Sequence, residues 1–205
     1  MIDIHQTAIL EGNILFEGDN ITIGPYSVIQ GLHGSSVTIG EGVEIGTGSK
    51  IGMHAEHRKL RSDHGVFIDA YSVIRENVVI HSGLYRDTVI RSDCYIMSDC
   101  YIAHDNIIED GVTLSSGCRI AGHSYLMTRC NLGMGSLVHQ YGVIGSYSML
   151  GMGSIVIKSS RVEPGMKYAG TPVRFLSRNS HALENYTISA EKLATESERF
   201  YALFS

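Results

Sequence analysis

Tryptophan is absent from this chain, and proline occurs only 3 times in 205 residues. No apolar run approaches the roughly 20 residues that a membrane-spanning helix needs, so we expect no membrane span. Residues 1–10 lack the charged segment and long apolar stretch of a signal peptide. The net charge is −5 and no basic run occurs, which argues against nucleic acid as a partner. We therefore expect a cytoplasmic protein with one folded unit.

What the chain does contain is an uninterrupted six-residue repeat of aliphatic residues. Neither a helix nor an alternating strand produces this spacing. Repeats of six residues are typical of parallel β-helices, in which each unit is a short strand and a bend, with about three units per turn. The chain should therefore wind into a triangular prism. Its axis would be filled by Ile90, Ile96, Ile102, Ile108, Leu114, Ile120, Leu126, Leu132, Val138, Ile144, Leu150 and Val156.

A second column of small residues lies two positions before each of these aliphatic residues. All 4 cysteines of the chain fall in this column, at Cys94, Cys100, Cys118 and Cys130. They do not show the CxxC spacing of a zinc site or a redox pair. We expect buried, unpaired thiols that fill inner corners and bind no metal, as suits a reducing cytosol.

The same spacing continues toward the N-terminus in shorter pieces. The residues expected to point inward there are Ile9, Leu15, Ile23, Ile29, Ile39, Ile45, Ile51, Ile68, Ile74 and Ile80. The spacing widens after Ile29, Ile51 and Ile80. We predict that the extra residues leave the prism there as three loops.

The repeat is predicted to end near residue 159. This divides the chain into a β-helix domain, 1–159, and an extension, 160–205. The extension should begin with an irregular stretch that contains two prolines. A helical pattern then runs from Thr187 to Phe204, with Ser189 as a plausible N-cap. We interpret it as a short helical appendage that covers an exposed apolar surface.

Residues 18 apart should stack on one corner, because three repeats make one turn. Ile102, Ile120 and Val138 form such a set, and a histidine follows each within three residues. The three loops should leave from the same edge. This edge, here called the histidine ridge, would collect His33, His54, His57, His64, His81, His104, His123 and His139. A functional groove along the ridge is favoured over a chance collection of solvent-facing imidazoles.

Histidines grouped in this way suit acid–base chemistry. An imidazole has an unperturbed pKa near 6.5, so it can accept a proton at neutral pH. No Ser-His-Asp arrangement accompanies the ridge and the cysteines are expected to point inward, so direct attack by a second substrate is favoured over a covalent intermediate. Asp105 follows His104 directly and is a candidate to hold the ring in one tautomer.

Three segments of the ridge carry a family resemblance. Ile102-Ala103-His104-Asp105, Ile120-Ala121-Gly122-His123 and Val138-His139-Gln140-Tyr141 resemble the UDP-N-acetylglucosamine O-acyltransferase family of lipid A biosynthesis. The resemblance implies a left-handed parallel β-helix and a homotrimer with its sites between subunits. It also implies a nucleotide-sugar acceptor and an acyl carrier protein thioester as donor, with no tightly bound cofactor.

The resemblance implies a role for each matching residue. His104 would be the general base that deprotonates a sugar hydroxyl, Asp105 would orient it, and the backbone amide of Gly122 would stabilise the oxyanion. Met152 would stand where the family reads acyl-chain length. Contacts to the substrates would come from Glu56, Arg58, His81, Tyr101, His123, His139 and Gln140.

Other activities remain open from the sequence. Residues 169–174, Ala-Gly-Thr-Pro-Val-Arg, resemble the tail of acetyl-CoA-dependent hexapeptide transferases, with Arg174 at the donor. The main alternative is therefore an acetyl-CoA-dependent sugar O- or N-acetyltransferase. A metal hydratase like the γ-class carbonic anhydrases is disfavoured because no two histidines lie five residues apart. A non-catalytic scaffold is disfavoured by the clustered histidines.

Overall fold

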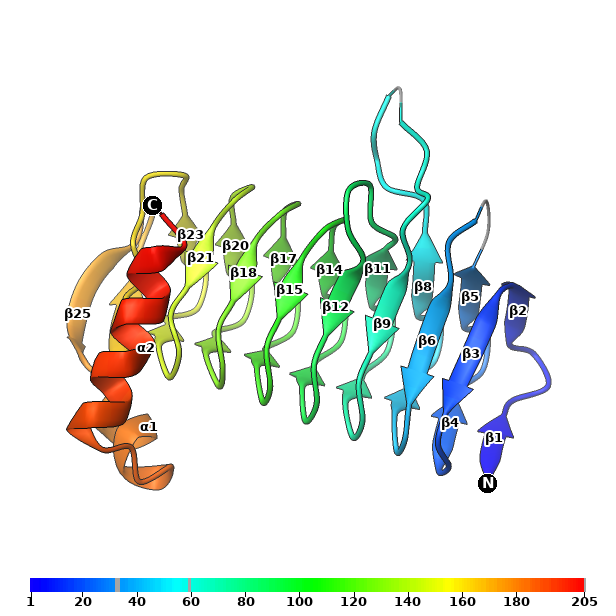
Figure 1. The fold of residues 1–205 in the computed structure, drawn as a ribbon, viewed down its shortest axis with the longest axis horizontal. Helices are drawn as coiled ribbons and strands as arrows, with labels where there is room; N and C mark the ends of the chain where they lie inside the picture. Colours follow the sequence, from blue (N-terminus) through cyan, green and yellow to red (C-terminus); the bar gives the residue numbers. More distant parts are fainter. Residues whose placement is uncertain (32–33, 59, 205) are drawn as a thin grey trace.

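The structure is a computed structural model that describes residues 1–31, 34–58 and 60–204. The predicted ridge residue His33 lies outside the described residues. Short parallel strands wind around one axis and form three sheets (Figure 1). From β1 to β23, consecutive strands belong to different sheets, and a strand pairs with the one three places before it. At the C-terminal end, β24 pairs in parallel with β22, and β25 pairs antiparallel with β24.

The strands of each sheet are as follows. Sheet A contains β1 (Ile2–Ile4), β4 (Ile21–Ile23), β7 (Glu44–Ile45), β10 (Val73–Ile74), β13 (Tyr95–Ile96), β16 (Thr113–Leu114), β19 (Asn131–Leu132), β22 (Met149–Leu150), β24 (Met166–Ala169) and β25 (Arg174–Arg178). Sheet B contains β2 (Ile9–Gly12), β5 (Val28–Gly31), β8 (Lys50–Met53), β11 (Val79–His81), β14 (Tyr101–Ile102), β17 (Arg119–Ile120), β20 (Leu137–Val138) and β23 (Ile155–Val156). Sheet C contains β3 (Ile14–Glu17), β6 (Val37–Gly40), β9 (Val66–Ile68), β12 (Thr88–Ile90), β15 (Ile107–Ile108), β18 (Tyr125–Leu126) and β21 (Val143–Ile144).

The coil is left-handed. In Figure 1 the strands of sheet C, nearest the viewer, run downward, and the more distant strands of sheet B run upward. The chain meanwhile advances from the blue N-terminus on the right to the red C-terminus on the left. This combination of rotation and advance defines a left-handed coil, and the predicted fold class is confirmed.

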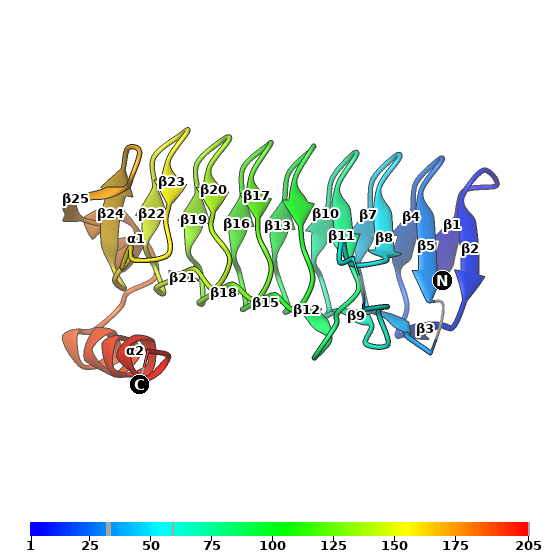
Figure 2. The ribbon, with the colours of Figure 1, turned by 90° about the horizontal axis from the view of Figure 1, so that it is seen from above.

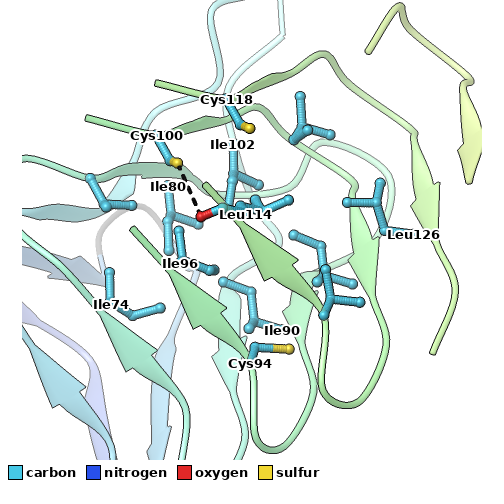
Figure 3. Packing of buried hydrophobic residues seen from close by; sticks show 14 of the residues in the cluster. Ile74, Ile80, Ile90, Cys94, Ile96, Cys100, Ile102, Leu114, Cys118 and Leu126 are labelled. Atoms are coloured by element: carbon cyan, nitrogen blue, oxygen red, sulfur yellow. Dashed lines mark hydrogen bonds between the residues drawn. The ribbon is translucent and has the colours of Figure 1, made fainter. Parts of the chain in front are cut away.

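The predicted core is confirmed as well. All twelve aliphatic residues from Ile90 to Val156 are at most 2% exposed, and the small residues two positions earlier are also buried. Figure 3 shows part of this core, in which side chains such as Ile90, Ile96 and Ile102 point into the prism and the Cys100 thiol is directed at the carbonyl oxygen of Leu114. Burial raises the pKa of Cys94 to about 12, so this thiol stays protonated and unreactive at neutral pH.

The first coil differs from the prediction by one residue. Ile9 and Leu15 were expected to point inward, but both are exposed. Leu10 and Phe16 pack against the core instead, in register with the inward residues of the next coil. Ile9 and Leu15 are six residues apart, and so are Leu10 and Phe16. All four residues are apolar, so the spacing did not distinguish the two registers. The inward prediction for Ile9 and Leu15 was wrong.

The prism also continues beyond residue 159. Val162 bridges to Ile144, and β24 pairs in parallel with β22, where an irregular stretch was predicted. Val162 and Tyr168 keep the six-residue spacing and are buried. The prediction of irregular structure was therefore wrong for β24. The division into units of 1–159 and 160–205 stays a prediction.

Two helices close the chain, α1 (Ser180–Asn185) and α2 (Ala190–Ala202). The Ser189 hydroxyl accepts the Lys192 N–H at 3.1 Å, as expected of an N-cap. The predicted helix thus exists, but it starts after Thr187 and ends before Phe204. Figure 2 shows α2 beside the C-terminal coils, outside the prism. Neither helix is long and apolar enough to cross a membrane, as judged over the described residues.

Candidate functional site

The loops and the stacked histidines share one edge, as predicted. The extra residues lie between β5 and β6, between β8 and β9, and between β11 and β12, where the chain passes from sheet B to sheet C (upper edge of Figure 1). Ile102 pairs with Ile120, and Ile120 pairs with Val138. The bends that follow these three residues are therefore stacked on the histidine ridge.

The bends place one residue of each coil in the left-handed backbone region. Asp105, His123 and Tyr141, 18 residues apart, have φ values of 60°, 58° and 62°. The His123 N–H donates to the carbonyl oxygen of His104 and the Tyr141 N–H to that of Gly122, both at 3.1 Å. The three side chains consequently form a column along the ridge.

His104 and Asp105 form a hydrogen-bonded pair. Nδ1 of His104 lies 2.6 Å from Oδ2 of Asp105, whose side chain is fully buried. The other oxygen accepts backbone N–H groups from Leu84, Tyr85 and Arg86 at 2.9, 2.8 and 3.0 Å. Burial alone would raise the pKa of Asp105, but these hydrogen bonds outweigh it and hold the pKa below the ordinary 3.8. The ionised carboxylate thus keeps the proton of His104 on Nδ1 and leaves Nε2 as the basic atom.

Gly122 lies directly against the His104 ring. A Cβ atom at this position would sit 2.7 Å from Cε1 and 2.9 Å from Nε2 of His104. The Gly122 N–H has no acceptor within the part of the chain that the structure describes. A free amide donor therefore lies beside the basic nitrogen, as an oxyanion site requires.

His123 completes this cluster. Its ring meets the His104 ring edge to face, with centroids 5.0 Å apart, and its Nε2 is 3.5 Å from Oδ2 of Asp105. Burial lowers the pKa of His123, and His104 and Arg86 lower it further, while Asp105 acts in the opposite direction. His104, Asp105 and His123 each offer one nitrogen or oxygen atom that could bind a metal ion, and these three atoms lie within 4.8 Å of one another. Because Nδ1 and Oδ2 are joined by a hydrogen bond, the arrangement suits proton transfer.

A second group of predicted residues meets on sheet B, beside the ridge. The Tyr101 hydroxyl donates to Oε2 of Glu56 at 3.2 Å, and the His81 ring lies 5.1 Å from the Tyr101 ring. Nδ1 of His81 donates to the carbonyl oxygen of His54 at 2.5 Å. Burial and then the Glu56 charge raise the pKa of Tyr101 to about 12. Tyr101 is therefore a protonated donor at neutral pH.

Other predicted residues lie apart from His104. The exposed His139 ring bonds through Nδ1 to the carbonyl oxygen of Gln140 at 2.9 Å. Arg58 lines a hollow of about 420 Å³ in the β8–β9 loop. Met152, between β22 and β23, and Arg174, at the start of β25, are exposed. Over the described residues, no hydrogen bond, ion pair or ring contact joins any of these side chains to His104.

Sequence reasoning missed two parts of the site. One is the backbone of Leu84, Tyr85 and Arg86, whose amides hold Asp105. No side-chain pattern signals such a role. The other is Tyr141, whose ring stacks on His123. Its signal was available, because Tyr141 stands 18 residues after His123.

Comparison with known proteins places these features in a family. Residues 87–122 match the family profile described as bacterial transferase hexapeptide (six repeats). A curated acyl-[acyl-carrier-protein]--UDP-N-acetylglucosamine O-acyltransferase of Paraburkholderia phymatum is 31% identical over all of this chain and 84% of its own length. The enzyme of the same name from Aliivibrio fischeri is 31% identical over 76% of this chain. That alignment spans 66% of the length of the relative.

Solved structures agree on the fold. A UDP-N-acetylglucosamine acyltransferase from Campylobacter jejuni is 22% identical and superposes with a TM-score of 0.78, over 97% of this chain and 83% of its own. The corresponding protein of Acinetobacter baumannii is 25% identical, with a TM-score of 0.68, over 95% and 81% of the two chains. This chain has the left-handed prism and the histidine ridge, and the Paraburkholderia phymatum relative matches it along the whole length of this chain. The chain therefore belongs to the UDP-N-acetylglucosamine O-acyltransferase family.

Proposed function

We propose that this protein transfers an acyl group from an acyl carrier protein thioester to a hydroxyl of a UDP-N-acetylglucosamine-like nucleotide sugar. The observation that carries the proposal is the geometry of three neighbours: His104 oriented by Asp105 at 2.6 Å, with Gly122 against its ring. The names of the relatives support the reaction class and both substrates.

The proposed reaction is one direct transfer. Nε2 of His104 takes the proton of the sugar hydroxyl while the hydroxyl oxygen bonds to the thioester carbonyl carbon. The resulting oxyanion accepts a hydrogen bond from the Gly122 N–H. When the carbon–sulfur bond breaks, His104 returns its proton to the leaving sulfur, so the products are an ester and a free thiol. General base catalysis of this kind contributes a factor of roughly 10²–10⁴.

The remaining predicted residues would bind the substrates. Glu56, Tyr101 and His81 form a polar group beside the ridge, suited to hydroxyl and amide groups of a sugar. We assign the nucleotide sugar to these residues and to Arg58, His123, His139 and Gln140. Met152 is proposed to limit the acyl chain and Arg174 to contact the donor. A cytoplasmic homotrimer is part of the same proposal.

The reaction is tested by mass spectrometry of the products formed from UDP-N-acetylglucosamine. Separate reactions receive a panel of acyl carrier protein thioesters or acetyl-CoA. We expect an acylated sugar nucleotide whose added group is released by mild alkali, as an ester is, and only with the carrier-protein donors. Product with acetyl-CoA alone would instead support the acetyltransferase, and an alkali-stable product would support N-acylation.

The role of His104 is tested in the same assay. His104→Ala should lower kcat by roughly 10²–10⁴-fold, since the base is lost, while binding of the sugar nucleotide persists. His5→Ala is the control, because His5 is an exposed histidine of the first coil. An unchanged rate in His104→Ala would remove His104 from the role of base.

A further inference from the structure

The column of Asp105, His123 and Tyr141 contains a ring stack that the proposed reaction has not used. The His123 and Tyr141 rings are nearly parallel, with 9° between their planes and 4.7 Å between their centroids. Neighbouring strands of a sheet lie about 4.8 Å apart. Because residues 123 and 141 occupy the same position in successive coils, the spacing of the prism itself sets the spacing of the stack.

The orientation of the His123 ring depends on neighbouring rings. Within the described residues, this imidazole forms no hydrogen bond, and its polar neighbour is Oδ2 of Asp105, 3.5 Å from Nε2. Three rings surround it: His104 edge to face at 5.0 Å, Tyr85 at 5.8 Å, and Tyr141 stacked. His104, in contrast, is fixed by its hydrogen bond to Asp105.

We infer that Tyr141 is a positioning residue, whose ring holds the His123 imidazole in the orientation that presents it to the substrate beside His104. The inference rests on the proposed function, in which His123 contacts the substrate. Tyr141 acts through His123.

Tyr141 contributes little to the core. Its side chain lies largely in solvent, with 57% of the residue exposed, and its left-handed φ of 62° is unfavourable for a bulky side chain. No hydrogen bond of its hydroxyl group is present within the described residues. The ring of Tyr141, rather than its hydroxyl, is therefore the part that contacts His123. Phenylalanine at this position should keep the effect.

The chain offers a matched control. Tyr26 also occupies a bend, with φ of 57° and 69% exposure, and among the described residues its ring stacks on no other ring. Asparagine suits the left-handed region, and this chain already places Asn77 there with φ of 57°. Replacing either tyrosine with asparagine thus removes the ring without adding backbone strain.

The experiment compares Tyr141→Asn, Tyr141→Phe and Tyr26→Asn by NMR and by kinetics. In protein labelled with ¹³C-histidine, the Hε1 resonance of His123 should show an upfield ring-current shift, assigned through His123→Gln. We expect Tyr141→Asn to lose this shift and to lower kcat/KM by up to about tenfold, because the loss of one aromatic pair corresponds to a rate factor of this size. Tyr141→Phe should restore both to within about twofold of the unmodified protein, and Tyr26→Asn should change neither.

Several outcomes would overturn the inference. An unchanged His123 shift in Tyr141→Asn would show that Tyr141 does not hold the ring. A lost shift with unchanged kcat/KM would show that the Tyr141 ring does not contribute to turnover. A Tyr141→Phe variant as impaired as Tyr141→Asn would assign the effect to the hydroxyl. If the unmodified protein transfers no acyl group, the proposed function fails, while the NMR comparison still reports on the stack.

Discussion

The contact between Gly122 and His104 shows how one missing side chain makes room for a base. The second position of other bends holds Ser98, Ser116 or Met134, so the backbone there tolerates a Cβ atom. At Gly122 a Cβ would instead collide with the His104 ring. The glycine is therefore required by its neighbour in the preceding coil.

This contact predicts the behaviour of Gly122→Ala. The added methyl group should displace the His104 ring, destabilise the protein by about 1–3 kcal/mol and lower kcat/KM by more than about tenfold. Urea unfolding and steady-state kinetics measure the two effects. The double variant His104→Ala with Gly122→Ala serves as control, since it has no ring to collide with and should be no less stable than His104→Ala. Equal destabilisation by Gly122→Ala with and without the ring would contradict the argument.

The site residues differed in how far the sequence could predict them. The three stacked bends followed from the spacing of Ile102, Ile120 and Val138. The contact between His104 and Asp105 did not, because adjacent side chains on a strand face opposite ways. It depends on the left-handed φ of 60° at Asp105, which brings the two side chains together. A backbone angle of this kind is set by the bend and not by residue type.

Among the elements, α2 is held to the prism by a partly buried ion network. Arg199 on α2 pairs with Oε1 of Glu109 at 2.5 Å and with Oε2 of Glu196 at 2.7 Å. Glu109 also accepts hydrogen bonds from Tyr125 and from the backbone and side chain of Thr128. Phe200 packs beside this network against Met127 and Val143, where α2 covers sheet C. Apolar burial and ion pairs therefore fix the helix together.

Acid should weaken this attachment. Burial raises the pKa of Glu109 and of Glu196, but hydrogen bonds and ion pairs outweigh it, so both pKa values lie below the ordinary 4.5. A carboxyl group whose folded-state pKa is lowered stabilises the fold above its unfolded pKa, and this contribution is lost as pH falls through the folded value. The network should thus contribute fully at neutral pH and fade below about pH 4.5.

Removing the bridging cation tests the network. We expect Arg199→Met to lower the free energy of unfolding at pH 7 by about 1–3 kcal/mol, less than for a fully buried pair because the Arg199 side chain is 44% exposed. The loss of stability between pH 7 and pH 4 should also become smaller. Arg91→Met is the control, because Arg91 forms an exposed pair with Asp69 at 3.9 Å. Urea unfolding at both pH values that found Arg199→Met and Arg91→Met alike would contradict the role of the network.

Elements were predictable wherever the six-residue spacing was unambiguous. It located the core and the edge from which the loops leave, and Ser189 signalled the start of α2. Where two adjacent residues are apolar, as at Ile9 and Leu10, the same spacing allowed two registers. The attachment of α2 was beyond prediction, because Arg199 and Glu109 are 90 residues apart. Such contacts depend on how the folded elements pack.

At the scale of the whole molecule, the site lies on a convex edge. Pockets for small molecules bury 70–90% of a drug-sized ligand, which the ridge of one prism cannot do alone. His139 and Tyr141 are exposed there. A second subunit facing the ridge would supply the missing wall. A closed ring of identical contacts would give every ridge the same partner, and the proposed homotrimer would be such a ring.

The proposed homotrimer is tested by sedimentation equilibrium. We expect a species with three times the chain mass of 22.4 kDa, with no lighter species at the concentrations used for the kinetic assays. Because each site would need its neighbour, dilution that dissociates the assembly should lower the activity per subunit along with the mass. His104→Ala should sediment like the unmodified protein, which separates loss of the base from loss of assembly. A 22.4 kDa species with full activity per subunit would show that one ridge is sufficient, and the need for a second wall would be wrong.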